Sequence, residues 1–437
     1  MKKVLCLLLV VCFCFVSCTA DKFDVSRKMQ NLGINGSEYW SDDTQEDIDS
    51  RVPFDMISTN GEIYLTGGSY IGNTGPVYLY AYKNDSKKGE MVGGTDAEQI
   101  NAFYEYDGVA FSFSVEPRLW DATSVYYKTA ESDMWGTKTA AIDGANNCFD
   151  MIKYKDKFFF AGSDSEKIEY EGGKIATSKA TLYCLEKDIL TAEKADYTQL
   201  EVVSQNGEII TFESIIQKHP TLGGYIAYGL PRMYSLFVYK DNLYAFYFNQ
   251  GSNDYTGFYR YDEEKNQFVY DEETDATFLI NECRKTAQDD EKIVHKFEWK
   301  DKFYFITDDL IVTDLKTYSF VKVAGYEDYK VQDVIFREDY ALCLVTRENE
   351  DGKFKNAVLK TTDFENFETL FYFTSKLGAQ SFEESENMFY FGLGYDTAYE
   401  LDENGNIAYD PVTYQPTQIL PKNYKEAGRV LRYRLKQ

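Results

Sequence analysis

The sequence repeats one unit seven times, and this repetition limits the fold more than any other feature. Each unit opens with two apolar-polar alternating runs joined by a polar corner, as in FDMIKYKDKFFFAGS (149–163). Asn-Gly and Asp-Gly corners are strong hairpin signals because both central residues of such a turn need positive φ. The seven corners are Asn60-Gly61, Asp107-Gly108, Asp156-Lys157, Asp241-Asn242, Asp301-Lys302, Asp339 and Glu386-Asn387.

A third apolar or tyrosine-rich run follows every corner and predicts a third strand. These runs cover residues 77–85, 124–132, 182–190, 257–265, 310–318, 357–365 and 397–405. Successive corners are 47, 49, 85, 60, 38 and 47 residues apart. About 40–50 residues of strand and turn is the size of a four-stranded propeller blade. No window has the period of an amphipathic helix of about twelve or more residues.

The predicted fold is therefore all-β, a β-propeller of seven four-stranded blades. The longest interval holds a further corner, Asn206-Gly207, within 198–214, so eight blades are one alternative and six are another. One small sheet cannot bury its aromatic residues alone, whereas a closed ring covers both faces of every blade. Closure needs a strand from one terminus beside the other, and 428–437 or 51–57 could supply it. We assign 51–437 to the propeller and 18–50, which contains SDDTQEDIDS (41–50), to a flexible acidic tether.

The first residues have the features of an export signal. Lys2 and Lys3 precede an apolar run, Val4–Val16, that is too short to span a bilayer comfortably. Its end, Phe15-Val16-Ser17-Cys18, resembles the lipobox of bacterial lipoproteins, although Phe15 stands where leucine is usual. The resemblance implies a signal peptide over 1–17, acylation of Cys18, and a lipid bilayer as partner. The protein would then be exported and anchored in the cell envelope, at the outer membrane or cell surface. The alternative is an ordinary secretory signal with a chance cysteine.

The charge excludes one class of ligand. Without residues 1–17 the chain has 44 basic and 72 acidic side chains, a net charge near −28. Such a surface repels nucleic acid, so nucleic-acid binding is excluded. Aromatic residues make up 16% of the chain, enough to build a large core.

Cysteines and histidines predict no metal centre. Beyond residue 18, four cysteines remain, and Cys184 and Cys343 lie in strand-like runs that favour buried free thiols. A Cys148–Cys184 disulfide is the alternative. The only histidines, His219 and His295, have no neighbouring ligand set for zinc. No cofactor is predicted. DENGN (402–406) and ENEDG (348–352) lack the distal Glu of a calcium loop. The alternative is a Ca²⁺ ion in an acidic axial channel.

Two stretches resemble the Asp-box of sialidase-like propellers. In AVLKTTDFENFETLFYF (357–373) the motif positions hold Thr361, Asp363 and Phe367, with Glu365 where the family has glycine. SVYYKTAESDMWGT (124–137) matches more loosely through Ser132, Asp133 and Trp135. Such boxes are structural, because the Asp side chain ties the turn by hydrogen bonds.

Arg51-Val52-Pro53 resembles the segment that opens the first blade of sialidases. The resemblance implies that Arg51 binds a ligand carboxylate, which arginine does bidentately. Sialidases also need further arginines, an acidic proton donor and a Tyr nucleophile with a nearby acid. The corresponding stretch after the first hairpin, Thr66-Gly67-Gly68-Ser69-Tyr70, has neither the second arginine nor the acid.

We therefore expect a non-enzymatic binding module for a glycan or protein ligand, with a divergent sialidase-like glycosidase as the alternative. No residue is assigned a catalytic role. The candidate ligand-binding residues are Arg51, Tyr70 and Trp120, the last two in loops after second strands. Most aromatic side chains are expected in the core, where they bury large areas.

Overall fold

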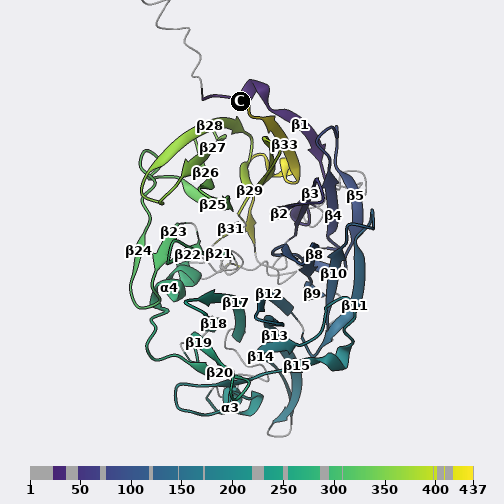
Figure 1. The fold of residues 1–437 in the computed structure, drawn as a ribbon, viewed down its shortest axis with the longest axis vertical. Coiled ribbons are helices and arrows are strands. Elements are labelled where there is room, and N and C mark those ends of the chain that lie inside the picture. The colour runs from purple at the N-terminus through teal and green to yellow at the C-terminus, as the bar shows by residue number, and fades with distance from the viewer. Residues whose placement is uncertain are drawn as a thin grey trace, which may run out of the picture.

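The strands of the chain are arranged in a ring of seven small antiparallel sheets around a central axis (Figure 1). The computed structural model describes residues 23–35, 48–68, 75–117, 122–145, 147–170, 173–218, 231–249, 254–285, 295–307, 309–396, 398–400, 408 and 417–436. The predicted seven-bladed β-propeller is confirmed.

Each of the first three blades pairs four strands in order from the axis outward. Blade 1 contains β2 (Pro53–Thr59), β3 (Glu62–Gly67), β4 (Tyr78–Tyr82) and β5 (Glu90–Gly94). Blade 2 contains β7 (Tyr104–Tyr106), β8 (Val109–Phe113), β10 (Ala122–Lys128) and β11 (Gly136–Asp143). Blade 3 contains β12 (Asn147–Tyr154), β13 (Lys157–Tyr170), β14 (Gly173–Leu185) and β15 (Tyr197–Gln199).

The next three blades follow the same order, and blade 4 has one strand more. Blade 4 contains β17 (Pro231–Tyr239), β18 (Asn242–Asn249), β19 (Gly257–Asp262), β20 (Gln267–Tyr270) and β16 (Glu201–Val203). Blade 5 contains β21 (Lys296–Trp299), β22 (Lys302–Ile306), β23 (Leu310–Thr313) and β24 (Tyr318–Phe320). Blade 6 contains β25 (Lys330–Phe336), β26 (Ala341–Glu348), β27 (Phe354–Thr361) and β28 (Phe367–Ser375).

Blade 7 joins the two ends of the chain. It contains β29 (Gly378–Ser385), β30 (Met388–Gly394), β33 (Arg429–Arg434) and β1 (Gln30–Ile34). Two further strand pairs are β6 (Ala97–Gln99) with β9 (Val115–Pro117) and β31 (Ala398–Tyr399) with β32 (Gln418–Ile419). The described helices are short: η1 (Ser26–Lys28), η2 (Lys194–Asp196), α3 (Phe212–Lys218), α4 (Thr277–Lys285) and η4 (Tyr424–Glu426).

All seven predicted corners join a first strand to a second strand. In blade 1 both turn residues, Asn60 and Gly61, have positive φ, as the Asn-Gly signal predicts. The same conformation occurs at Lys240-Asp241 and Lys300-Asp301, one position before the corners that we assigned. In blade 6 the turn instead runs from Arg337 to Tyr340, whose carbonyl accepts the Arg337 N–H at 2.8 Å.

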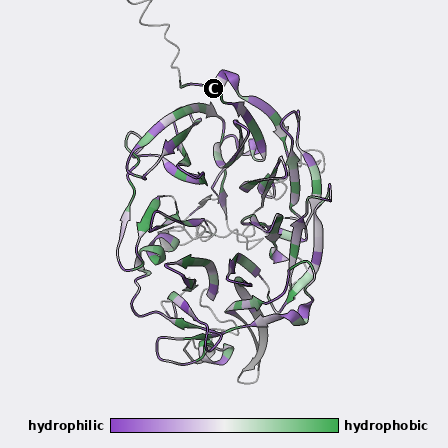
Figure 2. Cartoon of the chain, in the orientation of Figure 1, coloured by the Kyte–Doolittle hydropathy of each residue, from purple (hydrophilic) through white to green (hydrophobic). Residues whose placement is uncertain are grey.

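The hydrophobic core lies between the blades rather than at the centre of the ring. Buried side chains form seven clusters, one for each pair of neighbouring blades. Second strands such as β30 (MFYFGLG) are buried on both faces and therefore read as continuous apolar runs. The outermost strand β24 is exposed throughout. Figure 2 accordingly shows hydrophobic residues all round the ring.

The strand that closes the ring differs from the prediction. β1, inside the range 18–50 assigned to a tether, pairs antiparallel with β33 as the outer strand of blade 7. The tether is therefore wrong for residues 30–34. The third strand of blade 7 is β33, whereas the described residues of the predicted run, 398–400, contain the short β31. Residues 428–437 do contribute to closure, and 51–57 instead lie largely in the inner strand of blade 1.

The described residues of the 85-residue interval form no additional blade. β15 completes blade 3, and β16 runs parallel to β20 on the outer edge of blade 4. The Asn206-Gly207 corner follows β16, where the Ser204 N–H donates to the Glu208 carbonyl at 2.8 Å. The segment is thus an elaborated outer turn, and the eight-bladed alternative is excluded.

We expect Leu32→Ala in β1 to lower the free energy of unfolding by about 2–5 kcal/mol. Leu32 is buried in the cluster between blades 7 and 1, so truncation leaves a cavity in the closing junction. Urea unfolding followed by tryptophan fluorescence measures the change. Lys28→Ala, in the exposed η1, is the control and should change stability by less than about 0.5 kcal/mol. Equal stability of the two variants would contradict closure by β1.

Candidate functional site

The two faces of the ring carry different kinds of connection. On one face, the hairpin face, lie the seven tight corners between first and second strands. On the other, the loop face, lie the connections from second to third strands and from each blade to the next. The longest of these span 204–230, 271–295 and 395–428. Binding residues are found mostly on loops held by a rigid scaffold, so the loop face is the better candidate surface.

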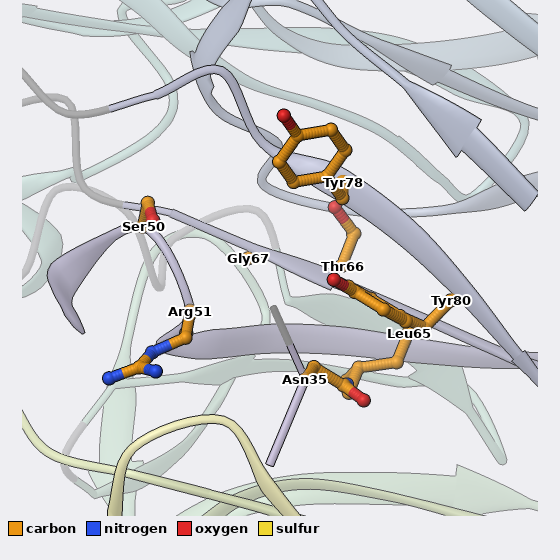
Figure 3. A pocket seen from close by; sticks show the side chains of 8 residues that line it. All are labelled: Asn35, Ser50, Arg51, Leu65, Thr66, Gly67, Tyr78 and Tyr80. Carbon is orange, nitrogen blue, oxygen red and sulfur yellow. The ribbon is translucent and has the colours of Figure 1, made fainter. Parts of the chain in front are cut away.

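A small pocket opens at the loop face, where blade 7 meets blade 1 (Figure 3). Its lining residues come from the ends of β1, β3 and β4 and from the turn before β2: Asn35, Ser50, Arg51, Leu65, Thr66, Gly67, Tyr78 and Tyr80. The interior of about 20 Å³ has room for one or two water-sized groups. A pocket of this size holds the tip of a ligand, such as a carboxylate or hydroxyl, rather than a whole sugar ring.

Ring closure builds this pocket. The Asn35 N–H donates to the Gly428 carbonyl at 3.0 Å, which fixes the end of β1 against the segment before β33. A side chain at Gly428 would come within 2.8 Å of the Arg51 Cβ, so the close approach of these segments requires glycine there. Residues 35, 51 and 428 are therefore held together by contacts between the two ends of the chain.

Two buried polar atoms in the pocket have no hydrogen-bond partner within the described part of the chain. They are Asn35 Nδ2 and Thr66 Oγ1, on residues that are 7% and 3% exposed. The other end of the Asn35 amide accepts a hydrogen bond from the Tyr82 hydroxyl, which fixes its orientation. Buried polar groups are nearly always paired, so these two atoms indicate a water or ligand group in the pocket.

Arg51, the predicted carboxylate-binding residue, lines the pocket but is 7% exposed. In Figure 3 its guanidinium is directed away from the rings of Tyr78 and Tyr80. Tyr70, Trp120 and Cys18 lie outside the described residues, so their predicted roles stay predictions. Sequence reasoning missed Asn35 and Thr66, because neither belongs to a local motif.

Three aspartates in inner strands link neighbouring blades near the axis. In each, one carboxylate oxygen accepts the N–H of the next residue and the other accepts an N–H of the following blade. These second bonds join Asp55 to Phe103 (2.7 Å), Asp150 to Leu236 (2.5 Å) and Asp333 to Phe382 (3.0 Å). All three lie at a bulge in the first strand. The repeated FDMI of residues 54–57 and 149–152 was the signal available in the sequence.

Asp150 also contacts blades 2 and 5. The Tyr104 hydroxyl from blade 2 donates to it at 2.8 Å, and the Lys296 ammonium from blade 5 forms an ion pair with it. Burial raises the pKa of Asp150 and lowers the pKa of Lys296, and each charge opposes the shift of the other. Four blades are thus connected through one carboxylate, which suits a structural role at the axis.

Three acidic residues, Asp55, Asp333 and Glu383, form a cluster at the junction of blades 6, 7 and 1. Burial raises the pKa of Asp55 to about 7, against the lowering effect of its two backbone N–H bonds. Burial, followed by the charge of Asp55, holds the pKa of Asp333 well above its ordinary value. Burial also raises the pKa of Glu383. The Arg337 guanidinium, 3.6 Å from the Glu383 carboxylate, opposes this rise. Part of each side chain remains accessible, as expected for residues that line the axis.

The described residues do not assemble the catalytic set that the sialidase resemblance implies. The pocket lining contains one arginine and no acid. Arg232, at the start of an inner strand, pairs with Glu116 at 3.5 Å and covers the ring of Phe149. Burial raises the pKa of Glu116 more strongly than Arg232 lowers it. This arginine therefore already contacts a carboxylate of the protein.

The turn predicted from the Asp-box has the expected hydrogen bonds. Asp363 accepts the backbone N–H groups of Glu365 and Asn366 at 2.9 and 2.7 Å and the Asn366 side-chain amide at 2.9 Å. The side-chain bond from Asn366, followed by the two backbone bonds, lowers the pKa of Asp363 to about 2. Asp314 ties the equivalent turn of blade 5 in the same way. In the looser match, the Ser132 hydroxyl rather than Asp133 accepts from Met134. These turns connect third to fourth strands and are structural.

The described cysteines form no disulfide, and the described residues form no metal centre. Cys148, Cys184, Cys283 and Cys343 are buried free thiols, so the Cys148–Cys184 disulfide is wrong. ENEDG (348–352) lies at a hairpin turn, and 402–406 lies outside the described residues. Within the described ranges, no group of three His, Cys, Asp or Glu side chains is placed to hold a metal ion, and no helix is long and apolar enough to cross a membrane.

Comparisons with known proteins show similarity of fold alone. No family model matches the chain, and no curated protein matches it. A prolyl endopeptidase structure is 12% identical with a TM-score of 0.40, over 82% of this chain and 50% of that one. A 6-phosphogluconolactonase-like protein from Bacteroides uniformis is 10% identical with a TM-score of 0.40, over 82% and 97%. The chain spans half the length of the prolyl endopeptidase, and these similarities carry no argument about activity.

The raised pKa of Asp55 predicts that stability falls as pH rises. An unfolded Asp has a pKa of about 3.9, so between that pH and about 7 the folded state keeps a proton that the unfolded state has lost. We expect the urea midpoint to decrease from pH 5 to pH 8, and to decrease less in Asp55→Asn. Asp107→Asn, at an exposed hairpin corner, should keep the wild-type pH dependence. A wild-type slope in Asp55→Asn would contradict the shift.

Proposed function

We propose that this protein is an exported lipoprotein of the cell envelope whose propeller is a non-enzymatic binding module. One observation carries the binding proposal: Arg51 lines a loop-face pocket with Asn35 Nδ2 and Thr66 Oγ1, two buried polar atoms that have no protein partner within the described residues. The Asn35 amide N–H and the Thr66 hydroxyl are suitable donors for the two oxygens of a carboxylate, and the positive charge of Arg51 in the pocket wall favours an anion.

The size of the pocket limits what the ligand presents. Since only one or two water-sized groups fit, the ligand would insert a carboxylate and lay the remainder over the loop face. Glycans with uronate or sialate residues, and proteins with acidic side chains, carry such groups on an exposed tip. The high negative charge of the chain opposes long-range attraction of acidic ligands, so short contacts in the pocket must supply the affinity.

Absence of catalysis is part of the proposal, and the described pocket supports it. Its lining offers no acid to protonate a leaving group or to activate a tyrosine. The pocket is also too small to enclose the ring carbon at which a glycosidase would act. A sialoside hydrolysis assay distinguishes the two functions, because turnover above the uncatalysed rate would favour the glycosidase alternative.

We expect an array of acidic and neutral glycans to show binding that depends on the carboxylate. Arg51→Ala should weaken binding of the best acidic glycan by about 10–100-fold, because it removes the positive charge from the pocket wall. Thr66→Val, which keeps the side-chain shape, should weaken it by about 3–10-fold. Arg260→Ala, on the exposed side of blade 4, is the control. Equal binding by all three variants, with unchanged melting temperatures, would refute the pocket as the site.

We expect Cys18→Ala to abolish acylation and to move the protein from the membrane fraction to the soluble fraction. The physical reason is that acyl chains contribute about 0.8 kcal/mol per buried methylene, and several chains give stable anchoring. Metabolic labelling with an alkyne fatty acid, followed by mass spectrometry of the N-terminal peptide, measures the modification. Cys14→Ala, inside the predicted signal peptide, is the matched control and should leave acylation unchanged. Persistent labelling of Cys18→Ala would disprove this anchor.

A further inference from the structure

We infer that the propeller contacts the anionic surface of the membrane with one segment of its rim, at the junction of blades 6 and 7. The inference rests on the proposed acylation of Cys18. It adds an orientation and a lipid-contacting surface, formed by residues 23–31 and the C-terminal segment 421–436. We call these residues the basic rim.

The chain becomes part of the ring only five positions after Cys18. The Val25 N–H donates to the Tyr372 carbonyl and the Tyr372 N–H to the Phe23 carbonyl, both at 2.9 Å, on the outer strand of blade 6. The Thr374 N–H donates to Ser26 Oγ at 2.9 Å. Val25 is 2% exposed in the cluster between blades 6 and 7. Residue 23 is therefore fixed by backbone hydrogen bonds to β28 and by the burial of Val25.

This pairing makes the connection to the lipid short. Only residues 19–22 separate Cys18 from Phe23, and a fully extended chain spans at most about 3.6 Å per residue. The five steps therefore reach about 18 Å at most. A tether over all of 19–50 would reach about 120 Å at the same spacing. A connection of this length keeps the rim near residue 23 within about 18 Å of the acylated residue, and therefore close to the bilayer.

The same part of the rim is basic in a strongly acidic protein. Residues 23–31 contain Arg27, Lys28 and one acid, and residues 421–436 contain six basic residues and one acid, so together they carry +6. The remaining residues of the chain carry −32, given the total of −26. Figure 1 places the C-terminus on the rim beside the start of the described chain, and Figure 2 shows hydrophilic residues there.

Part of this charge is directed to the solvent. Arg27, Lys28, Arg434 and Lys436 are exposed. Arg432 is buried, and its guanidinium donates to Gln30 Oε1. Lys376 and Arg429 form ion pairs with Glu426, which lines a shallow groove together with Ser26 and Met29. A cation near an anionic bilayer contributes about 1 kcal/mol, and the attraction decays over a Debye length of about 8 Å. The basic rim would be attracted and the other acidic surfaces repelled, so the ring would stand on this edge with both faces uncovered.

The test uses full-length acylated protein in vesicles of phosphatidylethanolamine and phosphatidylglycerol, with phosphatidylcholine vesicles for comparison. The described native cysteines are buried, so a single surface cysteine can be labelled selectively. Thr374→Cys places a fluorophore at the basic rim, and Lys265→Cys places one on blade 4, across the ring in Figure 1. Lipids with a nitroxide on the headgroup quench fluorophores close to the surface.

We expect at least threefold stronger quenching at position 374 than at position 265. Arg27→Glu, Lys28→Glu, Arg434→Glu and Lys436→Glu together should reduce the difference in anionic vesicles only. The matched control makes the same charge change on blades 3 and 4, through Lys155→Glu, Lys157→Glu, Lys240→Glu and Lys265→Glu, and is labelled at position 374. A linker of 30 Gly and Ser residues between Lys22 and Phe23 should remove the difference in neutral vesicles.

Two failures are distinguishable. If mass spectrometry finds no acyl group on Cys18, the proposed anchor and this inference both fall. If Cys18 is acylated but both fluorophores are quenched equally, the anchor stands and the orientation is overturned. Stronger quenching at 374 that the rim substitutions leave unchanged in anionic vesicles would overturn the electrostatic contact and leave only the short connection.

Discussion

Face-to-face packing of aromatic and aliphatic side chains between blades is the interaction on which this structure depends. Each of the seven junctions has one buried cluster, and second strands such as β18, β26 and β30 are buried on both faces. A sheet of this kind cannot be left uncovered on either side, so the first and last blades must meet. They meet through β1 on β33 and through Leu32, Met388 and Tyr390 against blade 1. The candidate pocket lies at this same junction, so the site exists only in the closed ring.

The buried acids have a different part in the same ring. Hydrophobic packing is non-directional, whereas an Asp carboxylate that bridges two backbone N–H groups fixes how one inner strand sits beside the next. Asp55, Asp150 and Asp333 each make such a bridge from one blade to the following one. Their raised pKa values show that burial disfavours the charged form, which is a cost to stability above neutral pH. In return, these hydrogen bonds fix the inner strands of neighbouring blades relative to one another near the axis.

Features fixed by local chemistry were predictable from the sequence, and features fixed by distant contacts were not. The seven corners follow from turn residues such as Asn60-Gly61, and the Asp363 turn follows from an Asx motif. β1 escapes prediction because QNLGI is short and its partner β33 lies some 400 positions away. The run at 397–405 resembles a third strand because nothing local distinguishes it from β33. Arg51 was found through a resemblance, but Asn35 and Thr66 become neighbours only on closure.

In the proposed arrangement, the rim attaches the propeller to the membrane and the loop face binds the ligand. Both ends of the described chain lie on the rim, so attachment there need not cover either face (Figure 1). The hairpin face carries the seven tight corners and the connections from third to fourth strands, whereas the longest connections lie on the loop face. If the basic rim rests on the bilayer, the axis of the ring lies along the membrane and the Arg51 pocket opens sideways. A large ligand could then approach the loop face without displacing lipid, which would not hold for a propeller lying flat on that face.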